Sequence, residues 1–206
     1  MKTLKFRPLT RAVVAATLGC VFGAAPLAMA RDDGHDDKGK FTTELSGYNE
    51  VHFVAAPTPA LRGAISTKAT GNFKATIDDA KQLIHYELNY QGLEGAVTQS
   101  HIHFGQRHTV GGIVVWLCQT DGTPAPANVA AVTPKCPPNT VSGPVTGTIA
   151  STQVLAQTAQ GIDAGEFEEL VRAIRAGATY VNVHSTLFPP GEIRGHLGKG
   201  KHHHNH

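Results

Sequence analysis

Alternating apolar and polar residues predict a chain made mostly of β-strands. In residues 83–90 every second side chain from Ile84 to Tyr90 is apolar, whereas His85 and the other intervening side chains are polar. This period of two is typical of a half-buried antiparallel strand, with one face on a core and the other in water. Further strand patterns occur at residues 41–45, 63–77, 101–103, 112–116, 145–150, 178–185 and 192–197.

A single helical pattern interrupts the strands. Four apolar residues recur at helical spacing between residues 167 and 174. Asp163, with Glu166 three residues later, predicts the N-terminal cap, and Gly177 predicts the end of the helix. Many short strands, turns rich in Gly and Pro, and one helix in a crossover connection predict an all-β fold, an antiparallel β-sandwich.

The two ends of the chain are expected to lie outside this domain. Residues 1–30 combine a basic start, a short apolar stretch and an Ala-Met-Ala cleavage pattern, which is typical of a secretory signal peptide. Residues 31–40 are charged and lack apolar anchors, so we expect a disordered leader. Residues 41–198 form the predicted domain, and residues 199–206 form a flexible His-rich tail able to capture metal ions.

Charge excludes one class of partner. Removing residues 1–30 takes away four of the 18 basic residues and none of the 16 acidic ones, which leaves a small net negative charge. No basic patch interleaves with aromatic residues, so we expect no nucleic acid partner. We also expect no membrane insertion after the signal peptide is cleaved, because its apolar stretch is shorter than a bilayer span.

Cleavage also leaves two cysteines, Cys118 and Cys136. In an exported protein such a pair is expected to form a disulfide, which here would restrain much of the Pro-rich segment 119–144. The less favoured reading makes them thiolate metal ligands. Together with the signal peptide, the pair predicts a periplasmic or secreted protein.

Histidines supply the candidate chemistry. His101 and His103 fall on the same face of a strand, so both imidazoles can bind one metal ion. His184, on a later strand, is the candidate third ligand. Neutral imidazole suits copper and zinc, and we place copper first because the predicted compartment is extracytoplasmic and thiolate ligands are lacking. The candidate fourth ligands are His196 and His52, and the candidates for orienting the imidazoles are Glu192, Asn182 and Arg194.

An ordered set of motifs resembles the CHRD domain, a module first described in chordin and widespread in secreted bacterial proteins. The motifs are residues 44–51 (Glu-Leu-Ser-Gly-Tyr-Asn-Glu-Val), Gly92-Leu93, His101-Ile102-His103, the helix ending in Gly177, residues 180–184 (Tyr-Val-Asn-Val-His) and residues 190–195 (Pro-Gly-Glu-Ile-Arg-Gly). The resemblance covers roughly residues 41–198 and implies a Greek-key, immunoglobulin-like sandwich, without implying an activity. The family often has Pro-Pro where this chain has His52-Phe53.

A weaker resemblance links the chain to copper/zinc superoxide dismutases. It rests on the sandwich, the His-x-His pair and a late valine-histidine strand, while the His and Asp run of the zinc half is missing. Arg194 is loosely comparable to the arginine that guides superoxide in that family.

Three functional hypotheses follow. The preferred one is a non-enzymatic binding module with a copper-type site and an unidentified protein partner. The alternatives are a dismutase-like redox copper enzyme and a metal-free structural or protein-interaction module, in which the histidines merely hydrogen-bond within the fold. We nominate no catalytic residue.

Overall fold

The computed structural model describes residues 39–54, 61–138 and 143–198. The predicted signal peptide (1–30), most of the predicted leader (31–40) and the His-rich tail (199–206) lie outside these residues. Within the described ranges, no helix has the length and apolarity that crossing a membrane requires.

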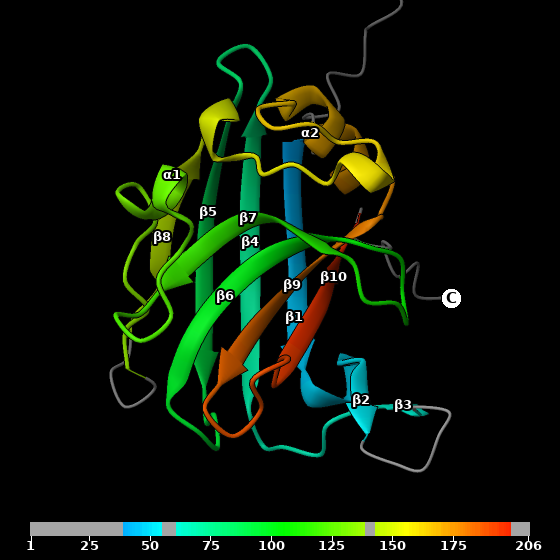
Figure 1. Ribbon diagram of the computed structural model, residues 1–206, viewed down its shortest axis with the longest axis vertical. Coiled ribbons are helices and arrows are strands. Elements are labelled where there is room, and N and C mark those ends of the chain that lie inside the picture. The colour runs from blue at the N-terminus through cyan, green and yellow to red at the C-terminus, as the bar shows by residue number, and fades with distance from the viewer. Residues whose placement is uncertain (1–38, 55–60, 139–142, 199–206) are drawn as a thin grey trace, which may run out of the picture. The chain divides into compact units, whose positions relative to one another are not determined.

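Eight antiparallel strands form one sheet in the order β7-β6-β9-β10-β1-β4-β5-β8, and β2 pairs with β3 in a separate two-stranded sheet (Figure 1). The strands are β1 Lys40–Ser46, β2 His52–Val54, β3 Leu61–Gly63, β4 Thr70–Asp78, β5 Leu83–Gln91, β6 Val97–Phe104, β7 Gly112–Gln119, β8 Val145–Ile149, β9 Thr179–Ser185 and β10 Ile193–Leu197.

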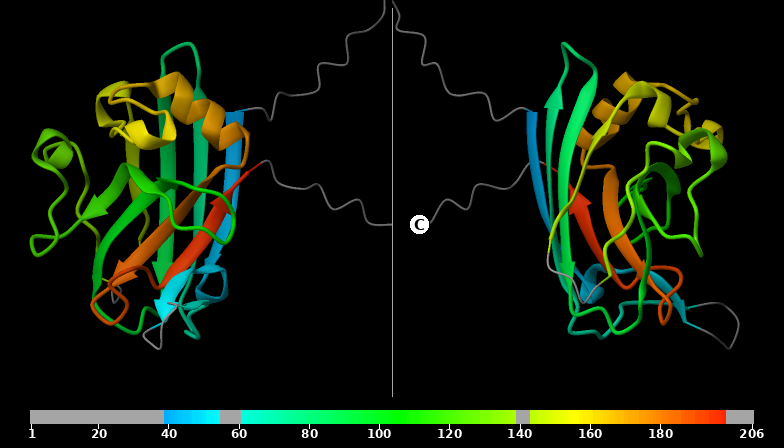
Figure 2. Two further views of the ribbon diagram at one scale, coloured as in Figure 1. Left: turned by 45° about the vertical axis from the view of Figure 1, so that its right-hand side comes forward. Right: turned by 90° about the vertical axis from the view of Figure 1, so that its left-hand side faces the viewer.

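The large sheet curves until it nearly closes into a barrel. Its two edge strands, β7 and β8, approach each other without pairing, and Figure 2 shows the two ends of the sheet facing each other across the interior. The hydroxyl of Tyr86 on β5 donates a hydrogen bond of 2.7 Å to the carbonyl of Leu117 on β7, which links the two ends. Curvature of this kind lets one sheet enclose its own apolar face.

The strand pattern predicted for residues 83–90 is confirmed. In β5, Ile84 and Leu88 are fully buried and Tyr86 is 6% exposed, whereas His85 is exposed. The same alternation places Ile102 of β6 and the valines of β9 in this core. Apolar side chains from strands around the curved sheet fill its interior. Their burial stabilises the sheet, because burial of apolar area is the main favourable term in folding.

Two α-helices and three 3-10 helices complete the described chain. Helix α2 lies in the connection from β8 to β9, and its buried residues join the core at one end of the sheet (Figure 1). The predicted helix is confirmed, but its cap is shifted: α2 starts after Glu166, whose carboxylate accepts a hydrogen bond from the backbone of Asp163 at 2.8 Å. The helices are α1 Ala127–Ala130, α2 Phe167–Arg175, η2 Gly47–Asn49, η3 Ser151–Gln153 and η4 Thr158–Gln160.

The predicted all-β class and the antiparallel pairing are confirmed. The eight strands belong to one continuous sheet, where the sequence predicted the two separate sheets of a sandwich. The Greek-key and immunoglobulin-like details stay predictions. The alternation of apolar and polar residues within a strand predicts which side chains face the core. It does not predict whether those side chains pack against a second sheet or against distant strands of the same sheet.

Cys118 and Cys136 lie at disulfide distance, with their sulfur atoms 2.02 Å apart. The segment between them is more ordered than its composition predicts, because it contains the short helix α1 and the buried Gln119 side chain binds it. The amide of Gln119 donates to the carbonyls of Ala130 at 2.7 Å and Thr133 at 2.8 Å. The segment is therefore held by the cross-link and by a buried polar group.

Candidate metal centre

Strands β6 and β9 are neighbours, and their pairing places the key side chains on one face. His101 pairs with Asn182 and His103 pairs with Tyr180. His184 follows Asn182 by two residues and therefore points to the same side of the sheet. Two histidines from β6 and one from β9 thus share a face opposite to the apolar core.

Irregular pairing surrounds the two histidines of β6. The register between β6 and β7 shifts between Ser100 and His101 and again between Ile102 and His103. Such bulges bend a strand and re-aim its side chains, and they are common beside functional sites. All four of these residues are buried, so β6 is covered on both faces at this point.

His101, His103 and His184 form a buried group. They are 0%, 7% and 5% exposed, and one nitrogen from each ring lies within 4.8 Å of the others. Nδ1 of His101 and Nε2 of His184 are 3.2 Å apart. The predicted third histidine therefore does meet the pair on β6.

Hydrogen bonds determine which nitrogens carry hydrogens. Nδ1 of His184 lies 2.7 Å from the carbonyl of Pro189, which can only accept, so this nitrogen donates. In the neutral ring, Nε2 of His184 then carries a lone pair and accepts a hydrogen bond from Nδ1 of His101. Nε2 of His101 is left with a lone pair, and this buried atom has no hydrogen-bond partner among the described residues.

His103 lies between two acceptors. Its Nδ1 is 3.0 Å from the carbonyl of Gly111, and its Nε2 is 3.1 Å from Oδ1 of Asn182. A neutral imidazole has one N–H, so it can donate to only one of them. Donation to the carbonyl leaves the lone pair of Nε2 facing an amide oxygen. The three neutral rings have three N–H groups and three lone pairs, but in this arrangement the lone pairs of Nε2 in His101 and Nε2 in His103 receive no hydrogen bond from the described residues. A bound cation would satisfy lone pairs of this kind.

Burial keeps the imidazoles of His101 and His103 neutral. It lowers the pKa of His103 to about 4, and the hydrogen bond to Gly111 offsets this only in part. Burial also lowers the pKa of His101 well below its ordinary value, and repulsion from His184 and His103 adds to the effect. Metal binding requires the deprotonated ring, so both residues are prepared as ligands at neutral pH.

Aromatic rings hold the histidines in place. The ring of His101 contacts Trp116 edge-on, with centroids 4.3 Å apart. The ring of His103 stacks in parallel on Tyr180, with centroids 4.6 Å apart. The guanidinium carbon of Arg194 lies 3.3 Å from the centroid of the Tyr180 ring, which makes a stack of cation, phenol and imidazole.

The donor set fits a metal ion held by nitrogen. Two ligands bound to one ion at 2.0–2.1 Å in tetrahedral geometry lie about 3.3 Å apart, close to the 3.2 Å between Nδ1 of His101 and Nε2 of His184. To bind an ion through Nδ1, His101 would move its hydrogen from Nδ1 to Nε2. The widest separation in the group, up to 4.8 Å, requires the rings to close by up to about 1.5 Å. His103 and His184 also contact backbone carbonyls through Nδ1, as ligating histidines do with the nitrogen that does not bind the metal.

The candidate fourth ligands do not join the group in the described residues. His196 on β10 lies outside it and lines a cavity with Arg107 and Arg194. The side chain of His52 lies outside the described residues, so this candidate stays a prediction.

The candidate orienting residues have different surroundings. Asn182 contacts His103 directly. Glu192 instead accepts hydrogen bonds of 2.8 Å from the hydroxyl of Thr67 and the backbone of Glu94. Arg194 contacts the ring of Tyr180, and Tyr180 in turn stacks on His103. The sequence predicted that these residues share a strand face with the histidines, but this was not enough to predict which of them contact the imidazoles.

Sequence reasoning missed Glu50. This carboxylate is 5% exposed and accepts a hydrogen bond from the backbone of Val51. Burial raises its pKa, whereas Val51, the Arg194 charge and Asn182 lower it. Glu50 therefore interacts with the side-chain amide of Asn182, which in turn contacts His103. In the sequence, Glu50 is recognisable only as an acidic residue within the motif of residues 44–51. No pattern in the sequence predicts that this motif lies near β9.

The lowered pKa values predict that the metal-free protein loses stability in acid. The folded-state pKa of His103 lies below its unfolded value near 6.5, so the unfolded chain binds the proton first and stability falls as pH decreases from about 7 to about 4. The loss from His103 alone is about 3 kcal/mol, and His101 adds to it in the same direction. Urea unfolding at a series of pH values measures this. A profile equally steep in the His103→Gln variant would contradict the assignment.

Gly191 is predicted to be intolerant of a side chain. Its φ is +135°, and a Cβ there would lie 2.8 Å from the carboxyl carbon of Glu50 and 2.9 Å from Nδ2 of Asn182. Gly191→Ala should therefore destabilise the protein by about 2 kcal/mol or more. The matched control is Gly122→Ala, whose Cβ would meet nothing within 4 Å and which should change stability by less than about 0.5 kcal/mol. Equal unfolding midpoints for the two variants would refute this prediction.

Comparison with known proteins gives one match. The CHRD domain family matches residues 41–197, nearly the range predicted from the motifs. No curated protein and no solved structure matches the chain. The matched range includes all three histidines and every strand of the large sheet except the first residue of β1. The chain therefore belongs to the CHRD domain family.

Proposed function

We propose that the protein is a non-enzymatic CHRD-domain binding module that holds one Cu(II) ion with His101, His103 and His184. The observation that carries this proposal is the buried group of three imidazoles, which offer one nitrogen each within 4.8 Å of the others and which include two lone pairs, on Nε2 of His101 and Nε2 of His103, that receive no hydrogen bond from the described residues. Neutral imidazole nitrogen suits both Cu(II) and Zn(II), and for a given nitrogen site Cu(II) binds more tightly than Zn(II).

The burial of the ligands supports binding over catalysis. An enzyme that acts on a dissolved substrate needs an open coordination position, whereas the three histidines are 0%, 7% and 5% exposed. Trp116 and Tyr180 pack directly against the rings of His101 and His103. Storage, sensing or structural stabilisation are the roles consistent with such a covered ion.

The compartment is part of the proposal. Cys118 and Cys136 lie at disulfide distance, and disulfides form and persist in oxidising environments. Together with the signal peptide predicted for residues 1–30, this supports a periplasmic or secreted protein.

Titration with Cu(II) tests the proposal. The predicted tail carries four histidines, so the protein is compared with a variant in which His202, His203, His204 and His206 are replaced by glutamine. We expect the tail variant to retain one Cu(II) per chain by calorimetry, with nitrogen hyperfine splitting in its electron paramagnetic resonance spectrum. Complete loss of binding in the tail variant would overturn the proposal, because the buried histidines would then hold no metal.

A further inference from the structure

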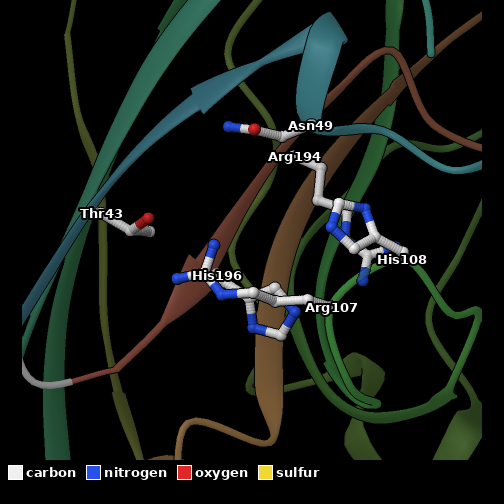
Figure 3. A pocket seen from close by; sticks show the side chains of 6 residues that line it. All are labelled: Thr43, Asn49, Arg107, His108, Arg194 and His196. Carbon is white, nitrogen blue, oxygen red and sulfur yellow. The ribbon is translucent and has the colours of Figure 1, made fainter.

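A polar cavity lies beside β10, and the three histidines of the metal centre do not line it. Its volume is about 100 Å³, enough for about three water molecules. Figure 3 shows four basic side chains grouped across from a hydroxyl and an amide. The lining residues come from β1, η2, the β6–β7 connection and β10, and they are Thr43, Asn49, Arg107, His108, Arg194 and His196.

The lining is strongly basic. Two arginines and two histidines face the cavity, and none of the described residues that line it is acidic. Burial lowers the pKa of His196, and repulsion from Arg194 and Arg107 lowers it further. Glu50 interacts with Arg194 but does not line the cavity. The cavity therefore concentrates positive potential where an anion would be stabilised.

His196 provides an independent sign of a missing ligand. Both of its ring nitrogens are buried and neither has a hydrogen-bond partner of good geometry in the described structure. Backbone groups of Gln106 and Thr179 lie near enough to raise its pKa, but neither meets the geometry of a hydrogen bond to the ring. Buried polar atoms are nearly always paired, so an imidazole with two unpaired nitrogens at the wall of a cavity points to a polar occupant.

Arg194 is already positioned for such an occupant. Its Nη1 donates to the carbonyl of Thr109 at 2.8 Å, and its Nη2 donates to the carbonyl of Gln106 at 3.2 Å. A guanidinium has five N–H groups, so three remain after these bonds. The same connection carries His108 with a φ of 61°, a strained conformation for a residue other than glycine. The two hydrogen bonds to Thr109 and Gln106 hold the guanidinium in place, so less side-chain entropy is lost when it binds a ligand.

We propose that this cavity binds a small tetrahedral oxyanion of the phosphate class, held by Arg107, Arg194 and His196. Donors that converge from separate elements match an ion with acceptor oxygens on every side, and arginine is the residue best suited to such an ion. The shared chemistry is a phosphate group, free or carried at the end of a larger molecule. The proposal does not depend on the metal centre, whose three proposed ligands are different side chains, although Arg194 also stacks on Tyr180 beside His103.

Calorimetric titration of metal-free full-length protein with inorganic phosphate, and separately with glycerol 3-phosphate, tests the proposal. We expect saturable binding of inorganic phosphate that weakens as NaCl is added. Arg107 is exposed, so Arg107→Gln should fold normally and weaken binding at least about tenfold. The matched control, Arg172→Gln, removes the same charge from helix α2, outside the cavity, and should leave binding unchanged.

The imidazole resonances provide a second readout. Phosphate should shift the ring signals of His196 and leave those of exposed His85 in place. Binding of both ligands would mean that the site accepts an esterified phosphate, and binding of inorganic phosphate alone would mean that it selects the free ion. Absence of binding by either ligand up to about 10 mM, or equal binding by the Arg107→Gln and Arg172→Gln variants, would overturn the proposal.

Discussion

His184→Gln is expected to weaken Cu(II) binding about 100-fold or more. Substitutions that only support a ligand lower metal affinity by about 10- to 100-fold, and loss of a ligand removes a metal–nitrogen bond directly. The same result is expected for His103→Gln and His101→Gln, since one nitrogen of each lies within 4.8 Å of the other two. Competition with a chromophoric copper chelator measures the affinities, in the background that lacks the tail histidines.

The control for this prediction is His85→Gln. His85 lies on the exposed face of β5 and contacts Thr148, so its loss removes a histidine without touching the buried group. Stability supplies an independent check, because a ligand that binds only the folded state at 100 times its Kd stabilises that state by about 2.7 kcal/mol. Added Cu(II) should therefore raise the unfolding midpoint of the protein and of His85→Gln, but not that of His184→Gln. Equal copper affinities across these variants would exclude the three-histidine site.

Arg194→Met is expected to destabilise the protein by about 3–5 kcal/mol. Arg194 is 1% exposed and is the largest fully buried side chain in the described residues. Methionine can fill part of the volume, but it cannot donate to the carbonyls of Thr109 and Gln106. It also leaves the buried carboxylate of Glu50 without the positive charge that lowers its pKa.

The loss should reach the histidines. Arg194 stacks on Tyr180, which stacks on His103. It also anchors the connection that presents the carbonyl of Gly111 to the same imidazole. We therefore expect weaker Cu(II) binding in the fraction of Arg194→Met that remains folded.

Arg107→Gln is the matched control for Arg194→Met, because it removes the same charge from the same cavity at an exposed position. Its unfolding free energy should change by less than about 0.5 kcal/mol. Chemical denaturation of the two variants compares them directly. A loss below about 1 kcal/mol for Arg194→Met would show that the guanidinium is not a main support of this region.

The amino-acid sequence determined which side chains share a face within each strand. The period of two is a local property of extended backbone, so the parity that places His101 with His103, and Asn182 with His184, follows from sequence alone. The helix pattern between residues 167 and 174 and the cysteine pair are also local or compositional signals, and the structure bears out both. The ordered motifs, which are a property of the sequence alone, also indicate the family that matches residues 41–197.

Strand order and register were decided only by the tertiary structure. That β6 lies beside β9 depends on how the sheet closes around its core, and no periodicity within a strand encodes it. The same closure sends His196 into a different cavity from His184, although both lie on strands with suitable parity. It also brings Glu50 behind Asn182 and the carbonyls of Gly111 and Pro189 onto the imidazoles, contacts between segments far apart in the chain. Alternation sets the direction of each side chain, but long-range pairing sets which side chains meet.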